Sequence, residues 1–77
     1  MEFSITKRID LRGVVCPMNF VKVKVALESI KSGEILEVVL DEGEAMLNVP
    51  RSLKEEGHKI LKVIPMDRTY KVIVEKA

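Results

Sequence analysis

Apolar segments of two different periods alternate along the whole chain, and this alternation is the feature that most restricts its fold. Directly after the only cysteine, four apolar residues recur at the intervals of one helical face: Phe20, Val23, Leu27 and Ile30. Pro17 suits the first position of a helix, and Gly33 suits the position that follows its last turn. The spacing therefore predicts a helix that begins at Pro17 and ends before Gly33.

A second segment of helical period lies in the stretch EAMLNVPRSLKEE, where Ala45, Val49 and Leu53 are spaced by four residues. Pro50 lies inside this segment, where a proline ring clashes with the carbonyl group four residues earlier. We therefore expect this helix either to kink or to start late, with Asn48 as its N-cap.

Four short segments have the composition of strands. Residues 3–11 alternate in part between apolar and polar, and residues 35–40 form a nearly continuous apolar run, as in a buried strand. Residues 60–66 and 70–75 are separated only by the stretch DRT. The last two segments are therefore predicted to pair as an antiparallel hairpin.

The predicted order is strand, helix, strand, helix, strand, strand, in a single domain that spans residues 1–77. Right-handed crossovers tend to place both helices on the same face of the sheet. We therefore expect the α/β class, as a two-layer α+β sandwich of βαβαββ order: a four-stranded mixed sheet with two helices on one face. In the third predicted strand, Leu61 and Val63 alternate with Ile60 and Ile64, so the other face of the sheet is not expected to be wholly polar.

Charge and composition argue against several classes of function. The formal net charge is +1, so no global field attracts nucleic acid or an anionic membrane. Only Phe3, Phe20 and Tyr70 are aromatic, which leaves no pair of stacking residues on one predicted strand for RNA. No apolar run approaches the roughly 20 residues of a membrane span, and the first residues lack the apolar core of a signal peptide. We expect a cytoplasmic protein that neither enters a membrane nor binds nucleic acid directly.

Cys16 lies directly before the first predicted helix. As the N-cap, its sulfur would face amide groups that have no intrahelical partner and the positive end of the helix dipole. Such positions lower the pKa of a cysteine from about 8.5 to roughly 3.5–7.5. Pro17 starts the helix without contributing an N–H, Arg12 adds a cation nearby in the sequence, and Gly13 adds a flexible backbone. The alternative is that Cys16 is a small buried apolar residue at a strand-to-helix corner.

A single cysteine and a single histidine argue against two other kinds of site. Dithiol redox chemistry needs a second cysteine, and a zinc site needs about four ligands. We therefore expect neither a metal nor a cofactor. His58 follows the second predicted helix, and nothing in the sequence places it near Cys16, so we expect it to be structural or exposed.

Two stretches, DLRGVVCPMNFVKVKVALESIKSGEILEVVLDEGEA and NVPRSLKEEGHKIL, resemble the TusA/SirA family of sulfur carriers. The matching elements are Asp10, Leu11, Arg12, Gly13, Cys16, Pro17, Gly33, Val49, Pro50, Gly57 and His58. The family carries Cys-Pro-X-Pro at its first helix, and Asn19 stands here in place of the second proline. Asn19 restores an N–H group and adds a polar side chain next to the expected sulfur site.

The resemblance implies that Cys16 accepts a sulfane sulfur from a cysteine desulfurase or a rhodanese-like donor. It then implies that Cys16 holds the sulfur as a persulfide and passes it to a downstream acceptor protein, for transfer-RNA thiolation, cofactor biosynthesis or other sulfur metabolism. The activity that the resemblance implies is of the sulfurtransferase type and depends on these partners. A single cysteine suits this role, because a second thiol nearby would attack the persulfide and release sulfide.

Several residues near Cys16 are candidates for docking partners. Met18 is expected at the rim of the sulfur site, and Lys22 and Lys24 are candidates for contact with an acidic donor, with an ordinary solvated helix surface as the alternative. Three acidic residues are expected at the same end of the sheet as Cys16, either solvated or attracting a basic partner: Asp41, Glu42 and Glu44.

Two other functions remain open from the sequence. Small mixed sheets with helices on one face also bind RNA, although this chain offers little charge or aromatic surface for that purpose. A thiol-independent regulatory or interaction domain is the other alternative, in which Asn19 marks the loss of sulfur transfer.

Overall fold

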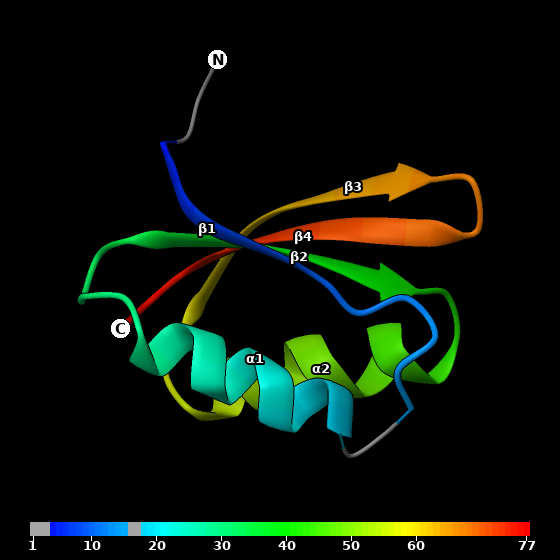
Figure 1. Cartoon of the computed structure of the whole chain (residues 1–77), viewed down its shortest axis with the longest axis horizontal. Helices are drawn as coiled ribbons and strands as arrows, with labels where there is room; N and C mark the ends of the chain where they lie inside the picture. Colours follow the sequence, from blue (N-terminus) through cyan, green and yellow to red (C-terminus); the bar gives the residue numbers. More distant parts are fainter. Residues whose placement is uncertain (1–3, 16–17) are drawn as a thin grey trace.

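The computed structural model describes residues 4–15 and 18–77, which form a four-stranded sheet with two helices on one face (Figure 1). The elements in chain order are β1 (Ile5–Asp10), α1 (Met18–Glu28), β2 (Ile35–Asp41), α2 (Glu44–Glu55), β3 (Lys59–Met66) and β4 (Thr69–Glu75). The strand order is β1-β2-β4-β3, with β1 parallel to β2 and the other two pairs antiparallel. The expected βαβαββ fold and the β3–β4 hairpin are confirmed.

The core lies between the helices and the inner face of the sheet. Along β2, every second residue is fully buried, namely Leu36, Val38 and Leu40. Their side chains pack against one face of each helix, and this contact removes apolar surface from water. The helices complete this core with Val23, Ala26, Leu27, Val49 and Leu53, and Ile30 joins it from the connection that follows α1. The helical spacing in the sequence therefore identifies the faces that are buried.

The second helix begins at Glu44 and continues through Pro50 to Glu55, so of the two alternatives, a kink or a late start, the late start with Asn48 as N-cap is wrong. Gly43 is the N-cap, with φ of 93°, a left-handed conformation that glycine adopts at little cost. Pro50 cannot donate the backbone hydrogen bond that an ordinary residue would. We attribute the continuity of the helix to the burial of Val49 and Leu53 around the proline.

The alternation expected in the third strand is interrupted by a bulge between Ile60 and Lys62. Ile60 pairs with Val74 and Val63 pairs with Val72, and both of these β4 residues are buried on the inner face. Ile60 and Val63 therefore point to the same face, although their spacing of three residues would place them on opposite faces of a regular strand.

The outer face of the sheet carries both apolar and charged side chains, as expected of a face that is not wholly polar. Ile73 lies opposite Glu37 in the β2–β4 pair. The Glu37 carboxylate is 3.5 Å from the Arg8 guanidinium and 4.0 Å from the Lys71 ammonium. In the part of the chain that the structure describes, no helix is long and apolar enough to cross a membrane.

Candidate functional site

Two parallel strands and the starts of two helices meet at one end of the molecule. β1 ends at Asp10 and β2 ends at Asp41, and short connections lead from them to α1 and α2 (Figure 1). Cys16 and Pro17, on which the predicted sulfur site depends, lie outside the described residues. The site is therefore built from the residues that flank them.

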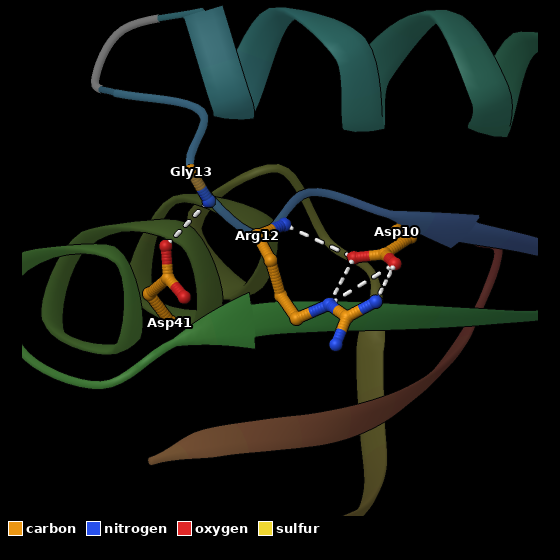
Figure 2. Close-up of polar contacts among 4 residues, drawn as sticks. All are labelled: Asp10, Arg12, Gly13 and Asp41. Atoms are coloured by element: carbon orange, nitrogen blue, oxygen red, sulfur yellow. Dashed lines mark hydrogen bonds and ion pairs between the residues drawn. The ribbon is translucent and has the colours of Figure 1, made fainter.

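Arg12 is held by Asp10 at the start of the connection between β1 and α1 (Figure 2). Its Nε donates to Oδ1 of Asp10 at 2.9 Å and its Nη2 donates to Oδ2 at 2.6 Å, while the backbone N–H of Arg12 donates to Oδ1 at 3.1 Å. Side-chain hydrogen bonds from Arg12 lower the pKa of Asp10 below its usual value, and the same bonds raise the pKa of Arg12. The cation predicted near Cys16 is thus engaged with the aspartate that ends β1.

We expect the Asp10 carboxylate to titrate below the usual range. Its pKa is lowered in the folded state, so its contribution to stability is present above the unfolded pKa of about 3.9 and is lost as the pH falls through the lower folded pKa. NMR titration of the Asp10 carboxyl carbon should give a midpoint below 3.9, and Arg12→Gln should move it back toward that value. Arg51→Gln, on the exposed surface of α2, is the control, and a wild-type midpoint at or above the unfolded value would contradict the prediction.

Gly13 is tied to the sheet by Asp41. The backbone N–H of Gly13 donates to Oδ2 of Asp41 at 2.6 Å, across a sequence separation of 28 residues (Figure 2). Gly13 has φ of 81°, so this turn favours glycine. On one side of the turn, Leu11 is buried and its N–H donates to the carbonyl of Val39 at 2.9 Å. A buried side chain and a carboxylate therefore fix the segment that leads to Cys16.

Asn19 is buried in the first turn of α1, with 1% of its surface exposed. Its backbone N–H donates to the Val15 carbonyl at 3.1 Å, and its side-chain Oδ1 accepts a hydrogen bond from the Phe20 N–H at 2.7 Å. The residue that replaces the family's second proline is therefore not solvated. It places a polar side chain inside the protein, within the turn that follows Cys16 in the sequence.

A pocket of about 160 Å³ opens beside Asn19. It is lined by Val14, Val15, Asn19, Asp41, Glu42, Glu44 and Ala45. The three acidic residues expected at this end of the sheet therefore do lie together, next to the loop that precedes Cys16. Asp41 combines two roles, because it lines the pocket and also accepts the hydrogen bond from Gly13.

The candidate docking residues point in different directions. Met18 is 49% exposed at the start of α1, and Lys22 is exposed on the side of α1 that faces β1. Lys24 lies toward α2, where its Nζ is 3.4 Å from the Glu56 carboxylate and 5.8 Å from the centre of the Phe20 ring. Lys22 is thus available to a partner, whereas Lys24 is already engaged within the chain.

His58 lies after α2, at the opposite end of the sheet from the site. Its Nδ1 accepts a hydrogen bond from the Ala77 N–H at 3.1 Å, as expected of a histidine that is structural or exposed and lies away from the candidate site. Among residues 4–15 and 18–77, no three His, Cys, Asp or Glu side chains are arranged so that they could hold a metal ion.

Comparison with known proteins identifies the family. The family model described as Sulfurtransferase TusA matches residues 7–76. A protein of Archaeoglobus fulgidus with the name "Putative sulfur carrier protein" is 42% identical over 69 residues, which cover 88% of this chain and 78% of that protein. The "Putative sulfur carrier protein YedF" of Escherichia coli K12 is 32% identical over 69 residues, or 90% of each chain.

A solved structure shares the fold. The crystal structure of a SirA-like protein from Desulfitobacterium hafniense matches with a TM-score of 0.78 at 22% sequence identity, and the match covers 90% of this chain and 95% of that one. Sequence and fold thus agree, and the chain belongs to the TusA sulfurtransferase family.

Proposed function

We propose that this protein is a sulfur carrier that holds a sulfane sulfur as a persulfide on Cys16. The main support is the position of the only cysteine in the sequence, between a fixed turn and the start of a helix. The Gly13–Asp41 hydrogen bond fixes the turn before it, and the buried Asn19 lies in the helical turn after it. Family membership supports the same role.

The proposed transfer conserves sulfur and electrons. The Cys16 thiolate attacks the terminal sulfur of a donor persulfide, a new S–S bond forms, and the donor cysteine leaves as its thiolate. An acceptor thiolate later attacks the terminal sulfur on Cys16, and Cys16 leaves as the thiolate. The start of a helix stabilises an anion through its dipole and through N–H groups that have no partner. In α1 the N–H groups of Asn19 and Phe20 already donate to the Val15 carbonyl and to Oδ1 of Asn19, so the dipole and the remaining amides of the first turn would favour the thiolate and the persulfide anion.

Two protein partners are required by this scheme. The donor is a cysteine desulfurase or a rhodanese-like protein, and the acceptor is a downstream protein with its own thiol. The residues described on either side of Cys16 and Pro17 suit such contacts, because Val15 is 73% exposed and Met18 is 49% exposed. We place the exchange in the cytoplasm, where a lone thiol stays reduced. Transfer-RNA thiolation, cofactor biosynthesis and other sulfur metabolism are the candidate destinations.

Mass spectrometry of the intact protein tests the proposal. After incubation with a cysteine desulfurase and cysteine, we expect the mass of one added sulfur atom, removable by dithiothreitol. Cys16→Ser should show no added sulfur, because no other thiol is present. Lys54→Gln, at an exposed position of α2, serves as the matched surface control and should load normally. Sulfur on the Cys16→Ser protein, or no adduct with any of several desulfurases and rhodaneses, would overturn the proposal.

A further inference from the structure

A groove of about 450 Å³ runs between α1 and β1. It is lined by Lys7, Ile9, Asp10, Leu11, Val14, Lys22, Val25, Ala26 and Ser29. Most of this lining is apolar, and the groove shares only Val14 with the smaller pocket beside Asn19. Sulfur transfer at Cys16 gives no role to the far part of the groove.

The strand that borders this groove is an edge of the sheet. Among the residues that the structure describes, β1 pairs with β2 alone. The Leu11 N–H donates to the Val39 carbonyl on the β2 side, so the N–H groups of Arg8 and Asp10, at alternate positions, are directed away from β2. An added strand could therefore pair with β1 and place every second side chain over the groove.

The helix that forms the other wall exposes apolar side chains toward solvent. Met18, Val21 and Val25 are spaced by three and four residues on α1 and are 49%, 44% and 61% exposed. Residues at this spacing lie on one side of a helix. Val25 also lines the groove, so this apolar stripe and the groove form a continuous surface.

The charged groups of the groove are arranged at its two ends. α1 begins where β1 finishes, so Lys22, in the second turn of α1, lies nearer the sulfur-site end, and Lys7 lies nearer the other end. Within residues 4–15 and 18–77, neither lysine is in an ion pair, whereas the Asp10 carboxylate is bonded to Arg12. The groove is therefore apolar in its middle and basic at both ends.

This charge pattern selects between possible occupants. A second copy of the chain, paired through its own β1, would bring Lys7 and Arg8 against the same residues, and like charges across a strand pair are destabilising. An acidic strand would instead meet both lysines. We propose that an extended acidic segment of a partner protein adds to the edge of β1, with an apolar side chain in the middle of the groove and a carboxylate at each end.

This binding is independent of the sulfur chemistry, and short synthetic peptides test it directly. In the sequence Thr-Glu-Thr-Val-Thr-Glu-Thr, a strand would direct both glutamates and the valine into the groove and every threonine outward. The control peptide, Thr-Lys-Thr-Val-Thr-Lys-Thr, has the same shape and the opposite charge. Titration of the ¹⁵N-labelled full chain should shift the amide signals of β1 and of α1 around Val25, with an affinity that falls as salt is added.

Charge reversal locates the binding site. Lys7→Glu combined with Lys22→Glu should weaken binding of the acidic peptide about tenfold or more, since two attractive pairs become repulsive. Lys54→Glu combined with Lys62→Glu is the matched control at exposed positions of α2 and β3, and should bind as wild type. Four results would overturn the proposal: no shifts on β1 and α1, equal binding of the lysine peptide, unchanged binding by the Lys7/Lys22 variant, or β1 shifts that depend on protein concentration and reveal self-pairing.

Discussion

Leu36→Ala is expected to lower the free energy of unfolding by about 2–5 kcal/mol. Leu36 is fully buried near the start of β2, a strand that lies between β1 and β4 in the sheet. It pairs with Lys7 of β1 on one side and with Val74 of β4 on the other. Removing its branched end loses apolar burial and leaves a cavity. Since small domains have a total stability of about 5–15 kcal/mol, the variant should be near the limit of folding.

Urea denaturation followed by circular dichroism measures this effect. Leu47→Ala makes the same chemical change on α2, where the side chain is 65% exposed, and should alter the free energy of unfolding by less than about 0.5 kcal/mol. Similar losses of stability in the two variants would contradict the position of Leu36 in the core.

The helices and the order of helices and strands along the chain could be predicted from the sequence because local pattern and burial agree there. Val23 and Leu27 on α1, like Val49 and Leu53 on α2, repeat at helical spacing and are all buried. The β3–β4 hairpin was predictable for a similar reason, since only a short polar stretch separates two apolar runs. These features depend on residues that are close in sequence.

The details that could not be predicted depend on backbone conformation. The bulge between Ile60 and Lys62 changes which side chains of β3 face the helices, and no residue type in that stretch marks it. Likewise, Asn48 has the side chain of a good N-cap, but the N-cap is Gly43, five residues earlier, a glycine with positive φ. In both cases the tertiary arrangement overrides a local preference.

Within the candidate site, the sequence placed Asp41, Glu42 and Glu44 at the end of the sheet where they do lie, but it did not reveal the contacts of each residue there. Asn19 was recognised as a departure from the family motif, and its burial could not be read from its polarity. Asp41 was interpreted as part of a charged loop, although its carboxylate holds the Gly13 N–H. The contact joins residues that are distant in sequence, and the one available signal was the parallel arrangement of β1 and β2, which brings their carboxyl ends together.

Asp41→Ala is therefore expected to weaken both the fold and sulfur loading. The Gly13–Asp41 hydrogen bond is exposed to solvent, so its loss should lower the free energy of unfolding by about 0.5–1.5 kcal/mol. The loss frees the turn that leads to Cys16, and under the proposed function the rate of persulfide formation should fall with it, because a mobile nucleophile is less often in position to react.

Two further variants separate the hydrogen bond from the negative charge. Asp41→Asn keeps a side-chain oxygen that can accept from Gly13, so it should retain most of the stability and most of the loading rate. Glu42→Ala removes a neighbouring carboxylate that lines the same pocket and leaves the Gly13 contact in place. The free energy of unfolding is measured by urea denaturation, and the initial rate of sulfur addition by mass spectrometry. By both measures, the wild type, Glu42→Ala and Asp41→Asn should be similar, and Asp41→Ala should be lower than all three. If Asp41→Asn were as impaired as Asp41→Ala, the charge of Asp41 would matter more than its hydrogen bond, and the turn would not be the feature that positions Cys16.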